Sequence, residues 1–137
     1  MLKGTNKYAE TDTLAYLDYY ENDEWIGWCG LGICSDEKTI MLHSVQIRGE
    51  YQNQGYGSKM IAEVIEFYKE QFFSNYPRLI LRVLKSNIPA LKIYVKNGFR
   101  TYEIEDSFLE YLVDPWEEDY NGEEPYKQYI FRMELKN

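Results

Sequence analysis

The stretch Gln52-Asn53-Gln54-Gly55-Tyr56-Gly57-Ser58 decides the fold of this 137-residue chain. It follows an apolar run that ends at Ile47 and precedes a helical pattern that begins near Gly57. A strand that turns through glycines into a helix leaves free backbone N–H groups at the positive end of the helix dipole. Such a turn binds phosphate or pyrophosphate, although ordinary strand-to-helix connections also contain glycines.

A second stretch, at residues 87–99, reads Asn-Ile-Pro-Ala-Leu-Lys-Ile-Tyr-Val-Lys-Asn-Gly-Phe. At these two places the chain resembles the GCN5-related N-acetyltransferase (GNAT) family. The family's pyrophosphate loop, Q/R-x-x-G-x-G/A, is matched by Gln52, Gly55 and Gly57. Its second signature, N-x-x-A-x-x-x-Y-x-K-x-G-F, is matched by Asn87, Ala90, Tyr94, Lys96, Gly98 and Phe99. The resemblance covers roughly residues 13–104 and a final strand near 127–136.

Length and charge limit the classes of protein to consider. The 137 residues suffice for one domain, residues 1–137, with a real core. A net charge of −8 argues against nucleic acid as a partner and favours cationic ligands. Cys29 and Cys34 lack metal-ligand spacing, so we expect reduced thiols on or near a strand and no metal. Because no secretory or membrane-spanning apolar segment is evident, we expect a cytoplasmic protein without a membrane partner.

Periodicity predicts an α/β domain with a mixed sheet. The turn residues 21–24 and 35–38 separate the first strands, and residues 1–12 stay unassigned. A short helix that begins after Thr11 or Asp12 is an alternative to the first strand. The expected strands are Thr13–Tyr20, Trp25–Ile33, Thr39–Ile47, Leu79–Leu84, Phe99–Ile104 and Gln128–Leu135, and the expected helices are Gly57–Phe73 and Pro89–Asn97, with Gly98 as the C-terminal cap of the latter.

The resemblance implies a GNAT fold: a mixed, mostly antiparallel sheet flanked by helices, with a shortened N-terminal part. Family members begin with a strand and two helices that form one wall of the acceptor cleft, but only about a dozen residues precede the first hairpin here. The shortening implies an open cleft, a homodimer partner that completes it, or replacement by another segment. The acidic insertion at residues 105–126, between the last two strands, is a candidate replacement. It either recognises a cationic amine or forms a solvated surface.

The resemblance also implies where the cofactor binds. The backbone N–H groups of the loop from Gln52 to Ser58, including Asn53, Gln54 and Tyr56, would bind the pyrophosphate of coenzyme A. In the family the preceding strand is splayed or bulged, pairs with the pantetheine arm and points an N–H at the thioester carbonyl. That role falls on Val45, Gln46 and Ile47. Asn87 would contact the cofactor, cap the helix before Pro89, or do both.

The family's general acid, which protonates the departing thiolate, falls on Tyr94; a core tyrosine is the alternative. The glutamate that some members use as a base is replaced by Met41. His43, the only histidine, lies two residues further on the same strand face and is a candidate base. Glu50, or a carboxylate of the acidic segment acting through water, are rivals, and a single base is not required.

The sequence therefore predicts an acetyl-CoA-dependent N-acetyltransferase in which a primary amine attacks the thioester directly within a ternary complex. The charge of the chain favours a cationic acceptor, but a small-molecule amine, a peptide N-terminus and a protein lysine all stay open. The alternative is a coenzyme A-binding module that is either non-catalytic or dependent on a partner chain.

Overall fold

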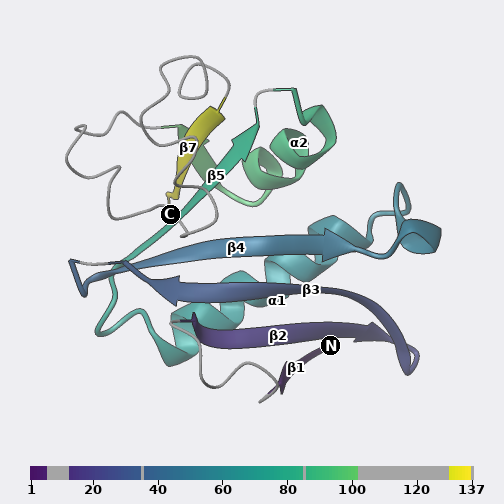
Figure 1. The fold of residues 1–137 in the computed structure, drawn as a ribbon, viewed down its shortest axis with the longest axis horizontal. Helices are drawn as coiled ribbons and strands as arrows, with labels where there is room; N and C mark the ends of the chain where they lie inside the picture. Colours follow the sequence, from purple (N-terminus) through teal and green to yellow (C-terminus); the bar gives the residue numbers. More distant parts are fainter. Residues whose placement is uncertain (6–12, 35, 85, 102–129, 137) are drawn as a thin grey trace.

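The computed structural model describes residues 1–5, 13–34, 36–84, 86–101 and 130–136. The described chain forms one seven-stranded sheet, two α-helices and a short 3-10 helix (Figure 1). The strands are β1 (Leu2–Thr5), β2 (Thr13–Glu21), β3 (Glu24–Ile33), β4 (Thr39–Ile47), β5 (Arg78–Leu84), β6 (Phe99–Thr101) and β7 (Ile130–Leu135); the helices are η1 (Gly49–Tyr51), α1 (Tyr56–Gln71) and α2 (Ile88–Lys96).

Most of the predicted elements are confirmed, and the differences are local. Strand β2 shows that the alternative helix after Asp12 is wrong from Thr13 onward. Strand β1 and helix η1 were not predicted, because each is too short to show a period. Both α-helices begin one residue earlier than expected, and α1 ends two residues earlier. Residues 102–104, 128–129 and the acidic segment 105–126 lie outside the described residues.

Turn chemistry explains how the first strands are joined. Asn22 and Asp23 both adopt positive φ, 50° and 66°, which suits the two-residue hairpin turn between β2 and β3. After β3, the Asp36 carboxylate accepts hydrogen bonds from the backbone N–H groups of Lys38 (2.9 Å) and Thr39 (3.0 Å). This side-chain-stabilised turn sends the chain back as β4.

The sheet order is β1-β2-β3-β4-β5-β7-β6, and every neighbouring pair is antiparallel except β4 and β5. Helix α1 forms the crossover between those two parallel strands. Their pairing is short: it joins Thr39–Met41 to Arg78–Ile80 and then stops. Figure 1 shows β4 and β5 diverging from this paired end. The sheet is therefore open in its middle.

Both helices contribute to a core on one face of the sheet. Strand residues Leu17, Cys29 and Leu42 share a buried cluster with Ile61 of α1 and Tyr94 of α2. In Figure 1, α1 lies behind the sheet, and no described element lies in front of β2, β3 and β4. The side chains that alternate with the core residues on these strands thus occupy a face that the described helices do not cover.

Strand β4 carries a bulge near its open end. Trp28 of β3 pairs with Gln46, but Gly30 pairs with His43, so Cys29 stands opposite both Ser44 and Val45. Ser44 adopts the left-handed conformation, with φ of 55°. A bulge of this kind bends the strand and re-aims the residues that follow it. The bulge therefore sets the direction of Val45–Ile47 at the point where β4 has left β5.

Candidate active site

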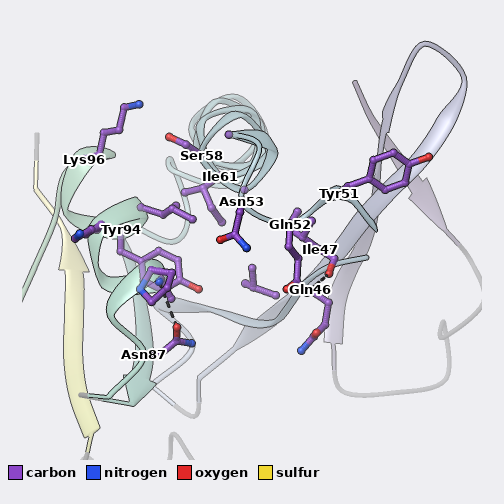
Figure 2. A pocket seen from close by; sticks show the side chains of 17 residues that line it. Gln46, Ile47, Tyr51, Gln52, Asn53, Ser58, Ile61, Asn87, Tyr94 and Lys96 are labelled. Carbon is purple, nitrogen blue, oxygen red and sulfur yellow. Dashed lines mark hydrogen bonds between the residues drawn. The ribbon is translucent and has the colours of Figure 1, made fainter. Parts of the chain in front are cut away.

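A cavity of about 690 Å³ lies at the open end of the sheet, between β4, the N-terminus of α1 and helix α2. This volume is within the usual range of small-ligand sites. Ten of the predicted site residues line it: Val45, Gln46, Ile47, Gln52, Asn53, Gly55, Gly57, Ser58, Asn87 and Tyr94. The structure therefore brings both sequence motifs to one cavity (Figure 2).

The loop before α1 exposes its backbone donors. Gly55 caps the helix with φ of 87°, a conformation that glycine adopts without steric cost. The first described bond into the helix runs from the Lys59 N–H to the Gly55 carbonyl at 3.3 Å. The three preceding N–H groups, at residues 56–58, are left at the positive end of the dipole, and the first turn contains no acidic side chain. The arrangement fits an anionic ligand.

Side chains fix the shape of this loop. The Gln52 amide donates to the Ile47 carbonyl at 2.8 Å, and the Gln54 amide donates to the Glu50 carbonyl at 2.8 Å. Gln54 does not line the cavity, and neither does Tyr56, whose ring packs edge-on against Tyr51. Their predicted contribution is thus restricted to the backbone.

Glycine at position 57 allows three elements to meet. A Cβ atom there would lie 2.9 Å from Ile93 Cδ1 of α2 and 3.8 Å from Ile47 Cγ1 of β4. Nearby, the Asn97 amide donates to Ser58 Oγ at 3.2 Å, which ties the end of α2 to the start of α1. Close packing at Gly57 therefore joins the two motifs across the cavity.

The charge of the cavity opposes the charge of the chain. Lys92 and Lys96 of α2 line it, and none of its described lining residues is acidic. Neither lysine was given a binding role from the sequence, although Lys96 belongs to the second signature, because lysines spaced four apart on a helix also typify a solvated face. Tyr51 was missed as well, since helix η1 was not predicted. A positive cavity in a chain of net charge −8 indicates selection for an anionic ligand.

Asn87 is the N-cap of α2, and its side chain accepts a hydrogen bond from the Ala90 N–H at 3.3 Å. The predicted capping role is confirmed, and the residue also lines the cavity. The amide nitrogen of the same side chain is a donor that the cap leaves available. Gly98 follows the helix with φ of 100°, as expected for the residue after a helix end.

Tyr94 is buried, with 7% of its surface exposed, and its ring packs edge-on against Phe99. In Figure 2 its hydroxyl points into the cavity from α2, toward the side formed by Gln46 and Ile47. Burial, with a smaller effect from Cys29, raises the pKa of Tyr94 to about 12. The phenol therefore holds its proton at neutral pH and is placed to donate it into the cavity.

His43 does not line the cavity. It lies half-buried on the opposite face of the sheet, where its ring contacts Tyr16 edge-on at 6.0 Å. Its Nδ1 lies 2.9 Å from Ser44 Oγ. His43 is thus next to the bulge, but on the other side of the sheet from Tyr94.

No group of three or more His, Cys, Asp or Glu side chains among the described residues could hold a metal ion. Neither described α-helix is both long and apolar enough to cross a membrane. Cys29 and Cys34 are free thiols, as predicted, and both are buried.

Comparison with known proteins gives a family match. The sequence model of the acetyltransferase (GNAT) family matches residues 3–99. No curated protein matches the chain significantly.

Similar solved structures are only 17–22% identical to this chain, but their TM-scores of 0.63–0.65 show that they share its fold. A GNAT family acetyltransferase from Elizabethkingia anophelis, with acetyl-CoA bound, is 22% identical with a TM-score of 0.64, and the match covers 96% of this chain and 80% of the other. The IAA acetyltransferase from Bacillus cereus is 17% identical with a TM-score of 0.63, covering 92% and 79%. A point mutant of spermidine N-acetyltransferase SpeG from Vibrio cholerae is 20% identical with a TM-score of 0.65, covering 95% and 69%.

Proposed function

Since the chain belongs to the acetyltransferase (GNAT) family and is thus an acetyl-CoA-dependent N-acetyltransferase, we propose that it acetylates a primary amine by direct attack within a ternary complex. One observation carries the proposal. A cavity without acidic side chains among its described lining joins the free N–H groups of α1, the bulged end of β4 and the Tyr94 hydroxyl. Phosphate binding, carbonyl polarisation and proton donation are thereby available in one place.

The cavity suits acetyl-CoA as the acetyl donor. The N–H groups of the loop from Gln52 to Ser58 would bind the pyrophosphate, and Lys92 and Lys96 would add positive charge. Asn87 would bind the pantetheine arm or the phosphate region of the cofactor through its amide. The edge of β4 that faces β5 would pair with that arm at Val45–Ile47, because its pairing with β5 ends at Met41, whereas the opposite edge stays paired with β3 as far as Ile47.

Catalysis needs charge stabilisation on the thioester oxygen and a proton for the sulfur. A backbone N–H within Val45–Ile47 would hold the oxygen, where negative charge grows in the transition state. Tyr94 would donate its proton to the departing sulfur. The nitrogen–carbon bond forms as the carbon–sulfur bond breaks, so no acyl-enzyme is required, and neither buried cysteine is used.

The acceptor amine is protonated in solution and must lose a proton before it attacks. We assign that step to His43, which adjoins the bulge on the face opposite Tyr94. Glu50, or a carboxylate of the acidic segment acting through water, are alternatives.

The acceptor class follows from charge. We infer a cationic small molecule or a peptide or protein amine, which residues 105–126 would attract by their carboxylates. One structural neighbour is a spermidine N-acetyltransferase by name, which is compatible with a polyamine acceptor. We place this single-domain protein in the cytoplasm, where its two thiols would stay reduced.

The test is release of free thiol from acetyl-CoA across a panel of polyamines, aminoglycosides and lysine peptides. Turnover confined to one amine class would support catalysis and identify the acceptor. Absence of turnover with every amine, together with calorimetric binding of coenzyme A, would favour the non-catalytic or partner-dependent module. A measurement of molecular mass in solution would then show whether a homodimer completes the cleft.

A further inference from the structure

We propose that Gly30 and Ser44 are positioning residues for the transfer: they hold the His43 imidazole flat on the sheet at the acceptor side of the bulge. The inference rests on the proposed function and goes beyond it. It assigns a role to a glycine and a serine that neither motif contains and that do not line the cavity.

Gly30 lies directly against the imidazole ring of His43 and leaves room for it. It pairs directly with His43 across β3 and β4. A Cβ atom at position 30 would lie 2.5 Å from His43 Cε1, 2.8 Å from Nε2 and 3.1 Å from Nδ1. Real Cβ atoms do not approach other heavy atoms to 2.5 Å, so any other residue would displace the imidazole. The ring therefore occupies the space that the missing side chain leaves.

Gly32, two residues along the same strand, also lies against the imidazole, but a larger residue would fit at this position. A Cβ atom there would lie 3.5 Å from His43 Cδ2 and Nε2, an ordinary contact distance. The two glycines thus share a strand, a face and a neighbour, but differ in whether alanine fits. They form a matched pair for an experiment.

Ser44 fixes the orientation of the ring. Its Oγ lies 2.9 Å from His43 Nδ1, and its φ of 55° at the bulge brings the hydroxyl to that nitrogen. If Nδ1 carries the proton of that bond, Nε2 is the basic nitrogen. Tyr16, which pairs with Gly30 on the other side of β3, closes the site with its ring edge.

The location suits proton removal from the acceptor. Val45 and Ile47 pack against the core on the helix side, whereas His43 lies on the face that the described helices leave uncovered. With the acetyl donor and Tyr94 on the helix side, the amine would approach from the face of β4 that carries His43. His43 takes a proton from the amine nitrogen, this nitrogen bonds to the acetyl carbon, and Tyr94 returns a proton to the sulfur.

The experiment compares Gly30→Ala with Gly32→Ala, each in the wild-type and the His43→Ala background. We expect Gly30→Ala to lower kcat about tenfold or more, within the range for a displaced general base, and to leave the KM for acetyl-CoA within about twofold. Gly32→Ala should stay within about twofold of wild type in both constants. In the His43→Ala background, Gly30→Ala should cause no further loss, because it acts through the imidazole.

A spectroscopic measurement reads the geometry apart from catalysis. His43 is the only histidine, so a protein without a histidine tag gives one pair of imidazole ¹⁵N resonances. The chemical shifts of these two resonances should change in Gly30→Ala and should be the same as in the wild type in Gly32→Ala. Ser44→Gly, which removes the hydroxyl and tolerates the positive φ, should change the tautomer that the shifts report. This second variant keeps the test decisive if Gly30→Ala folds poorly.

Equal effects of the two alanine variants on kcat and on the resonances would overturn the proposal. So would a loss in Gly30→Ala that persists undiminished without His43, since that loss would come from the sheet. Failure of the proposed function gives a different pattern: wild type itself turns over no amine. With an active wild type, the positioning role stands or falls on the variants alone.

Discussion

At the scale of single residues, Tyr94 tests the chemistry most directly. Tyr94→Phe should lower kcat about 100-fold or more, because the thiolate then leaves without its proton donor. The KM for acetyl-CoA should change less than about twofold, since the ring and its packing against Phe99 are retained. Steady-state kinetics with the acceptor from the thiol-release panel provide both constants.

Tyr68→Phe is the matched control for this prediction. Tyr68 is also buried, and its hydroxyl donates to the Tyr76 carbonyl at 2.5 Å, away from the cavity. Its loss should reduce stability by about 1 kcal/mol and leave kcat nearly unchanged. Similar kcat values for the Tyr94→Phe and Tyr68→Phe variants would contradict the role of Tyr94 as proton donor.

At the scale of elements, Asn87 separates a capping role from a binding role. Aspartate caps a helix as well as asparagine, so Asn87→Asp should retain the stability of the protein, whereas Asn87→Ala should lose about 1 kcal/mol. Coenzyme A affinity should fall in both, because neither keeps the amide donor and aspartate adds a negative charge near phosphates. Urea unfolding and calorimetry measure the two quantities separately.

An Asn87→Asp protein that binds coenzyme A as tightly as wild type would restrict this residue to its structural role. The reverse pattern, loss of stability in the aspartate variant with normal binding, would contradict the cap as well.

Sequence reasoning predicted elements where local signals are strong. β4 was placed correctly because an apolar run stops at Ile47 before a glycine loop, and α2 because Pro89 and Gly98 bound it. β1 was missed because its four residues are held by pairing with β2, a long-range contact. The cavity role of Lys92 was missed because the pattern of a helix gives its faces but not which face meets a ligand.

The bulge in β4 likewise depends on contacts between strands that local sequence signals do not reveal. The family resemblance implied a splayed or bulged strand, and the structure has one. Its position opposite Cys29 depends on the register of β3 against β4, which was not predicted from the sequence. The packing of His43 against Gly30 could be recognised only when that register was known.

At the scale of the whole molecule, buried ionisable groups predict alkaline instability. Burial raises the pKa of the Cys29 and Cys34 thiols from 9.0 to about 12. Above pH 9 the unfolded chain therefore releases protons that the folded chain retains, so the free energy of unfolding falls as pH rises toward 12. Each fully buried thiol contributes at most about 1.4 kcal/mol per pH unit.

Urea unfolding under reducing conditions should thus show a loss of about 2 kcal/mol per thiol, about 4 kcal/mol for the two, between pH 8 and pH 10.5. Cys34→Ala should shrink that loss, because one of the two thiols is removed. A free energy of unfolding that stays constant over this interval would contradict the burial of the thiols.

Because the pairing of β4 with β5 is short, the sheet consists of two halves, β1–β4 and β5-β7-β6, which are joined by only three residue pairs. A ligand that pairs with the open edge of β4 would stabilise the junction between these two half-sheets. Its binding energy then adds to the cohesion of the whole fold, about 2.7 kcal/mol at a hundredfold excess over Kd. Amide hydrogen exchange at residues 45–47 and 82–84 should slow together when coenzyme A is added. In such a protein the co-substrate is also a structural component, and supply of acetyl-CoA would govern how long the folded chain persists as well as how fast it works.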